Sequence, residues 1–139
     1  MRYWLFKSEP DTWGWQHQLA RGDKGEEWSG VRNYQARNFM RDMAIGDLGF
    51  FYHSQQGKEI VGIVTVSATS HPDSTTDDPR WDCVDIIALK PLKTPVTLAA
   101  IKSDPRLTDM VLVKNSRLSI QPVTPVEWQI ICTLGGVSS

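Results

Sequence analysis

The segment WSGVRNYQARNFMR, residues Trp28 to Arg41, places an aromatic residue, a glycine turn and three arginines around the start of one predicted helix. Asn33 is a favoured N-cap residue. The apolar residues that follow recur at i, i+3, i+4 and i+7, the spacing of one helix face: Ala36, Phe39, Met40 and Met43. We therefore expect an amphipathic helix that begins after Asn33 and ends before Gly46.

This segment carries more binding groups than a folding core requires. Unpaired N–H groups at a helix start attract anions, and Arg32 and Arg37 add positive charge there, which predicts a phosphate site. Trp28 and Tyr34 lie on either side of the Gly30 turn and offer flat faces for base stacking. The alternative is that both aromatic residues are core and the arginines form a solvated helix face. Spacing alone does not decide between the two.

The composition indicates a single globular domain. The chain has 139 residues, enough to bury a core without staples. Its net charge of −1 and pI of about 6.3 argue against coating of long duplexes by bulk charge, so any nucleic-acid contact is expected to be local. Six tryptophans favour aromatic recognition surfaces.

Cysteine usage and hydropathy exclude several other classes. Cys83 and Cys132 form no C-x-x-C pair and have no suitably spaced histidine, so we expect neither a disulfide framework nor a zinc site, and no other metal or cofactor. The N-terminus lacks the pattern of a signal peptide, and no apolar run approaches membrane-spanning length. The expectation is a cytoplasmic protein without membrane contact.

Local patterns predict short strands and few helices. Strands are expected over residues 3–6, 48–52, 59–67, 83–89 (ended by Pro91) and 116–121. Helices are expected from Asp11 or Thr12 to near Gly22, over 98–102 after Thr97, and from the capping box Thr124-Pro125-Val126-Glu127 to Gly135. Gly62 suggests a bulge, residues 23–27 a polar loop and 70–80 a surface loop. An α+β domain on a small open β-barrel with flanking helices follows.

Several further segments point to one known family. They are Tyr3–Pro10, Gly46-Asp47, Phe50–Ser54, Pro79-Arg80-Trp81, Pro95-Val96, Ile101-Lys102 and Arg117–Ser119. Together with Trp28–Met40 they resemble the EVE domain family of the PUA-like superfamily, whose relatives include YTH and ASCH domains. The resemblance covers nearly the whole chain and implies a single PUA-like domain over residues 1–139, with a 70–80 loop shorter than is usual in the family.

The resemblance and the residue chemistry together nominate a pocket for one nucleobase. Its candidate residues are Ser8, Glu9, Trp28, Asn33, Tyr34, His53, Ser54, Trp81 and Ser119. Candidate phosphate-binding residues are Lys7, Arg32, Arg37 and Arg117. A base that leaves the stack loses a few kcal/mol, so it needs aromatic partners and edge-directed hydrogen bonds in return.

The sequence is compatible with three different functions. The first is a non-catalytic nucleic-acid-binding module that reads a modified base in DNA or RNA, as the resemblance implies. The second is a nucleotide-directed hydrolytic enzyme that uses His53 with a carboxylate such as Glu9, although G-x-S-x-G, H-E-x-x-H and paired-cysteine patterns are lacking. The third is a pocket protein for a small metabolite. The sequence is equally compatible with DNA and RNA, with several base modifications and with any oligomeric state.

Overall fold

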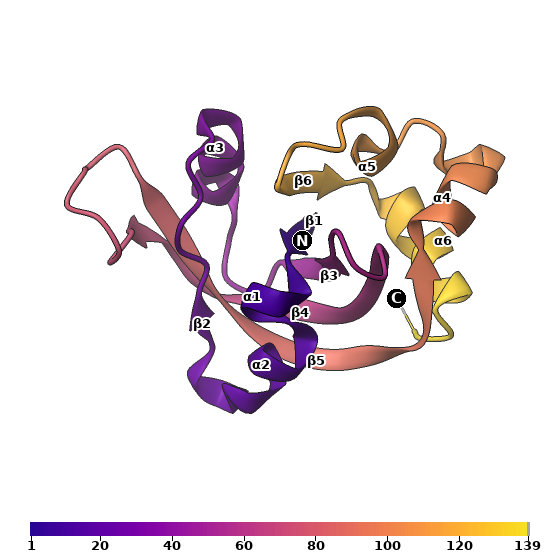
Figure 1. Ribbon diagram of the computed structural model, residues 1–139, viewed down its shortest axis with the longest axis horizontal. Helices are drawn as coiled ribbons and strands as arrows, with labels where there is room; N and C mark the ends of the chain where they lie inside the picture. Colours follow the sequence, from indigo (N-terminus) through magenta and orange to yellow (C-terminus); the bar gives the residue numbers. More distant parts are fainter. Residues whose placement is uncertain (139) are drawn as a thin grey trace.

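The computed structural model describes residues 1–138 and builds them around one six-stranded sheet (Figure 1). Its strands are β1 (Tyr3–Ser8), β2 (Glu26–Glu27), β3 (Leu48–His53), β4 (Glu59–Pro72), β5 (Asp82–Thr97) and β6 (Ile120–Val123). They lie in the order β2-β5-β4-β3-β1-β6 without closing into a ring. Only the β1–β3 pair is parallel within the described chain. The predicted α+β class with an open, PUA-like sheet is confirmed.

Helices flank this sheet. They are α1 (Pro10–Trp13), α2 (Trp15–Ala20), α3 (Tyr34–Asp42), α4 (Leu98–Ser103), α5 (Val111–Lys114) and α6 (Pro125–Leu134), with 3-10 turns at Gly22–Lys24 and Pro105–Leu107. Figure 1 shows α3 beside the β4–β5 hairpin at one end, and α4, α5 and α6 gathered at the other. None of the described helices is long and apolar enough to cross a membrane.

Both faces of the central strands are buried, which explains their nearly continuous apolar sequence. Because side chains alternate along a strand, Trp4 and Phe6 enter one core cluster while Leu5 enters another. Met40 of α3 packs in the first cluster, and Trp128 of α6 packs in the second. The sheet therefore separates two cores, and the loops at the ends of its strands remain available for binding.

Local capping signals were predicted correctly at three helices. The Asn33 side chain accepts a hydrogen bond from the Ala36 backbone N–H at 2.9 Å, which begins α3 as expected. Thr97 caps α4 in the same manner. Thr124 and Glu127 form the reciprocal capping box of α6.

Pro91 does not end β5, so that prediction was wrong. The strand continues to Thr97, and Pro91 lies opposite Gly62 of β4 between shifts in register. A proline is tolerated there because the ladder is already interrupted by the bulges. Gly62 itself is required by close packing, since a Cβ atom would lie 2.4 Å from the Trp15 ring.

Other predicted boundaries also differ from the structure. The first helix is two helices with Glu9 as the N-cap of α1, because the extended backbone of Gly14 interrupts them. The last strand begins at Ile120, so Arg117 and Ser119 precede it. The loop expected over 70–80 is shorter, since β4 extends to Pro72, and the polar loop 23–27 contains a 3-10 turn and β2.

Candidate functional site

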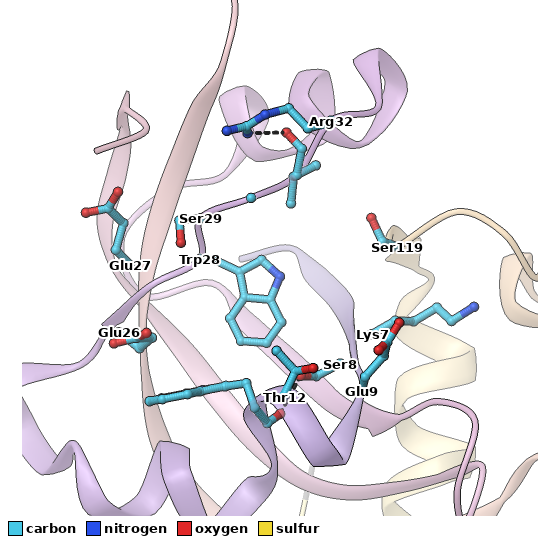
Figure 2. Close-up of a pocket in the computed structure, with 13 residues that line it drawn as sticks. Lys7, Ser8, Glu9, Thr12, Glu26, Glu27, Trp28, Ser29, Arg32 and Ser119 are labelled. Atoms are coloured by element: carbon cyan, nitrogen blue, oxygen red, sulfur yellow. Dashed lines mark hydrogen bonds between the residues drawn. The ribbon is translucent and has the colours of Figure 1, made fainter. Parts of the chain in front are cut away.

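A cavity of about 500 Å³ opens between the end of β1, the start of α1, β2 and the turn that precedes α3 (Figure 2). This volume lies within the range of small-molecule sites, about 300–1,000 Å³. The residues that line it are Lys7, Ser8, Glu9, Thr12, Trp13, Glu26, Glu27, Trp28, Ser29, Gly30, Val31, Arg32 and Ser119. The structure therefore brings together Ser8, Glu9, Trp28 and Ser119 of the predicted pocket, with Lys7 and Arg32 of the predicted phosphate site.

Trp28 is both a core residue and a cavity wall. Its ring makes edge contacts with Phe6 and Phe51, at centroid distances of 5.5 and 5.7 Å. Its backbone N–H donates to the Val84 carbonyl at 2.8 Å, which fixes the segment to β5. Figure 2 shows the indole between Arg32 and Ser8, with its nitrogen on the side of Ser119. Trp28 can therefore be a core residue and also offer a ring face to a ligand in the cavity.

Trp13 is a second aromatic wall that the sequence analysis did not nominate. Its indole Nε1 donates to the Gln18 side chain at 3.0 Å, and the buried Gln18 amide donates to the Ile86 carbonyl at 3.1 Å. This chain of hydrogen bonds ties a half-buried ring to β5. The connection joins residues far apart in sequence, so local pattern carried no signal for it.

The polar side chains of the cavity differ in how firmly they are held. The Ser8 hydroxyl donates its proton to the Trp13 carbonyl, so that proton is already used in a hydrogen bond within the protein. Glu9 accepts from the exposed Gln55 amide at 3.3 Å. Burial raises the pKa of Glu26, although Arg21 at 3.3 Å opposes this effect. Glu26 was missed because its segment was expected to be a polar loop.

A second cavity of about 720 Å³ adjoins the first and shares Lys7, Glu9 and Ser119 with it. Its other lining residues are Tyr52, Ser54, Gln55, Lys58, Leu98, Lys102, Ser116 and Arg117. Lys7 donates to the Ser116 carbonyl, and burial lowers the pKa of its amine. Predicted residues Ser54 and Arg117 thus lie in this neighbouring groove, which carries four cationic side chains.

The rim of the first cavity is held by Asp73, which follows β4. This buried carboxylate accepts hydrogen bonds from the Gly30 backbone at 2.8 Å, Arg32 at 3.0 Å and Thr75 at 2.6 Å. Burial opposes its ionisation, but the hydrogen bonds from Thr75, Gly30 and Arg32 hold the pKa of Asp73 at about 2. Gly30 has a φ of 84°, a conformation that glycine adopts without strain. The charge of Arg32 is consequently paired.

Tyr34 and Trp81 stack on each other outside the cavity, with ring centroids 5.0 Å apart. Arg37 lies over Tyr34 at 4.8 Å and Arg32 over Trp81 at 5.5 Å. Arg80 also donates to the Tyr34 hydroxyl at 3.1 Å. The structure therefore joins these two aromatic residues to arginines rather than to the pocket, and the Asn33 side chain caps α3 instead of facing the cavity.

His53 also lies outside the cavity lining. Its Nε2 accepts a hydrogen bond from the Trp15 backbone N–H at 3.0 Å. Burial lowers the pKa of His53, although Glu59 opposes this, so the neutral ring is favoured. Ser54 donates to the Ser8 carbonyl at 3.2 Å and fixes the adjacent turn. The side chains of His53 and Ser54 therefore both form hydrogen bonds that stabilise the local structure.

Comparison with known proteins identifies similar chains of known fold. The family model described as the EVE domain matches residues 2–134. A protein from Agrobacterium tumefaciens is 56% identical, with a TM-score of 0.97 over 99% of this chain and 94% of that one. Human thymocyte nuclear protein 1, solved in complex with DNA containing 5-methylcytosine, is 32% identical, with a TM-score of 0.90 over 100% of both chains.

Two further proteins show the same relationship at different levels of similarity. An uncharacterised protein of Schizosaccharomyces pombe is 36% identical over 94% of this chain, which spans 66% of that protein's length. The YTH domain of the Zygosaccharomyces rouxii MRB1 protein, solved with N6-methyladenosine RNA, is 17% identical, with a TM-score of 0.60 over 99% of this chain and 89% of that one. At this identity the likeness concerns the fold alone.

Proposed function

Because the chain belongs to the EVE domain family, we propose that it binds DNA containing a modified base and accommodates that base in the 500 Å³ cavity. The observation that carries this proposal is the pairing of the Trp28 and Trp13 walls with polar side chains in one concave site. Its support from outside the chain is the human relative, which covers the whole fold and was solved with 5-methylcytosine DNA.

The lining chemistry suits a base with an exocyclic amino group. Carboxylates accept hydrogen bonds from the cytosine amino group, and the carboxylate residues Glu9 and Glu26 line the cavity. Val31 and the two indoles supply apolar surface for a methyl substituent. A flipped methylated cytosine would therefore meet acceptors at its polar edge and apolar groups elsewhere.

The adjoining groove suits the sugar-phosphate backbone. The groove is lined by Lys58, Lys102 and Arg117, and Lys7 lines both the groove and the cavity. Phosphates on either side of a flipped nucleotide need such contacts, which add affinity without reading sequence. Arg32 contributes less charge than the sequence suggested, since Asp73 pairs with it at 3.0 Å.

We propose binding without conversion of the base. The lone pair that His53 would need as a general base already accepts the Trp15 N–H. The nucleosides recovered by chromatography after long incubation should therefore be those supplied. A new nucleoside that is formed by the wild-type protein and lost with His53→Ala would favour the hydrolytic enzyme instead.

A binding titration tests the reader function directly. Short DNAs with one 5-methylcytosine, and the same sequence with cytosine, are compared by fluorescence anisotropy at one salt concentration. Burial of one methyl group contributes about 0.8 kcal/mol, so we expect about a fourfold preference for the modified DNA. Trp13→Ala should weaken binding of the modified DNA by about 1–3 kcal/mol, the range for one stacked base.

Trp81→Ala is the matched control, because Trp81 lies outside the cavity. It should leave the preference for the modified base unchanged. Equal affinity for both DNAs, together with equal effects of the two substitutions, would contradict the cavity as the reading site. Preference for RNA of the same sequence would keep the site but change its partner, and binding of the free nucleoside alone would indicate a metabolite pocket.

A further inference from the structure

Three neighbouring strands bring a carboxylate, a thiol and an imidazole together on one face of the sheet. His71 of β4 lies opposite Cys83 of β5, and Glu27 of β2 lies opposite Asp85 of β5. Cys83 and Asp85 are two residues apart, so their side chains share a face. Since β5 pairs with both β2 and β4, hydrogen-bonded backbone holds the group in place.

The distances within this group match those of a metal site. One ligand atom from each of Glu27, His71 and Cys83 can be chosen so that all lie within 4.8 Å of one another. The Cys83 sulfur is 3.9 Å from Nδ1 of His71. A tetrahedral zinc ion with ordinary bond lengths places such a sulfur and nitrogen about 3.6 Å apart. The Cys83 and His71 side chains would need to approach each other only slightly to bind one ion.

Surrounding contacts orient these side chains as they do in metal centres. Asp85 accepts from His71 Nε2 at 2.8 Å, which leaves Nδ1 on the side of Cys83. A carboxylate on the far nitrogen is one of the common partners of a metal-bound histidine. Glu27 Oε1 accepts from the Ser74 N–H at 2.7 Å, which leaves its second oxygen for a ligand. Cys83 is fully buried, so solvent does not compete for its sulfur.

We propose that Glu27, His71 and Cys83 bind one divalent transition-metal ion of the zinc class, with water at the fourth position. On binding, the Cys83 thiol and Nδ1 of His71 each release a proton to solvent, and Nδ1 exchanges its 3.1 Å hydrogen bond to the Pro72 carbonyl for the metal. The ligands come from three strands without a short repeat, which is why the sequence analysis expected no zinc site.

Such an ion would brace one wall of the cavity. Glu27 precedes Trp28 directly, and Figure 2 shows its carboxylate turned away from that indole. His71 stands two residues before Asp73, which accepts the Gly30 N–H. Metal binding would thus join β2, β4 and β5 next to the turn that forms the rim.

Calorimetric titration of chelator-treated protein with zinc chloride tests the site, with cobalt(II) as a spectroscopic probe. We expect one equivalent bound per chain and a thiolate-to-cobalt charge-transfer band. Cys83→Ser should remove the band and weaken zinc binding at least about tenfold, and Asp85→Asn should weaken it about 10–100-fold. Cys132→Ser is the matched control, because Cys132 is the chain's other buried cysteine and lies in α6.

His71→Ala provides a second variant at a half-exposed position, for use if Cys83→Ser does not fold by circular dichroism. It should also weaken zinc binding at least about tenfold. The proposal is overturned if the folded wild-type protein binds no stoichiometric zinc. It is equally overturned if zinc binding survives loss of the Cys83 thiol and the His71 ring, or is lost with Cys132→Ser.

Discussion

Trp28 illustrates what single residues in this sequence do and do not reveal. Its position beside Gly30 and Arg32 made it a candidate, but only its contacts with Phe6 and Phe51 place it in the core as well. Trp13 had no comparable signal, because Gln18 holds its ring through a contact with a distant strand. Residue type suggested which side chains can bind, and long-range packing decided which of them meet.

Asp73 should make stability depend on acid pH. Its folded-state pKa of about 2 lies below the ordinary value of 3.8, so folding favours the ionised form. The resulting stability, about 2 kcal/mol, is present above about pH 4 and is lost as the pH falls toward 2. Asp73→Asn should therefore be less stable than wild type near neutral pH, with a difference that shrinks in acid. Urea unfolding across this pH range measures it.

Asp77→Asn is the appropriate comparison for that experiment, because Asp77 is an exposed carboxylate of the same loop. It should change the free energy of unfolding by less than about 0.5 kcal/mol throughout. A destabilisation by Asp73→Asn that is constant from neutral to acid pH would show that geometry, and not charge, is what Asp73 contributes.

At the scale of elements, the predictions were correct where local interactions determine the structure and wrong where long-range pairing determines it. The caps of α3, α4 and α6 arise from residues three apart, so the sequence predicts them. The length of β5 depends instead on pairing with β4 across several bulges, and Pro91 alone misled the prediction. The start of β6 depends on pairing with β1, which no local pattern encodes.

The α6 capping box offers a direct measurement at this scale. Thr124→Ala removes the hydroxyl that accepts the Glu127 N–H at 3.2 Å, so we expect a loss of about 1 kcal/mol in the free energy of unfolding. Thr133→Ala, near the other end of the same helix, should cost less than about 0.5 kcal/mol. Equal denaturation midpoints for wild type and Thr124→Ala would contradict the assigned role of the cap.

At the scale of the whole molecule, the proposed function assigns base recognition to the first cavity and backbone binding to the adjoining groove. Lys102→Ala and Arg117→Ala should weaken modified and unmodified DNA equally, and each should reduce the slope of log affinity against log salt by about one. Lys24→Ala serves as the control, because this exposed lysine lines neither cavity. A change in base preference without a change in salt slope would move these residues into the reading site.

The position of β1 between β3 and β6 has a consequence for the order of synthesis and folding. Because β1 precedes β6 by more than a hundred residues, β1 is synthesised well before the strand that becomes its second neighbour. Until Ile120–Val123 is available, one edge of β1 has unpaired N–H and C=O groups beside apolar side chains. Such an edge pairs readily with other chains, so we expect the chain without β6 to be the aggregation-prone species and the pairing of β1 with β6 to be the slow folding step.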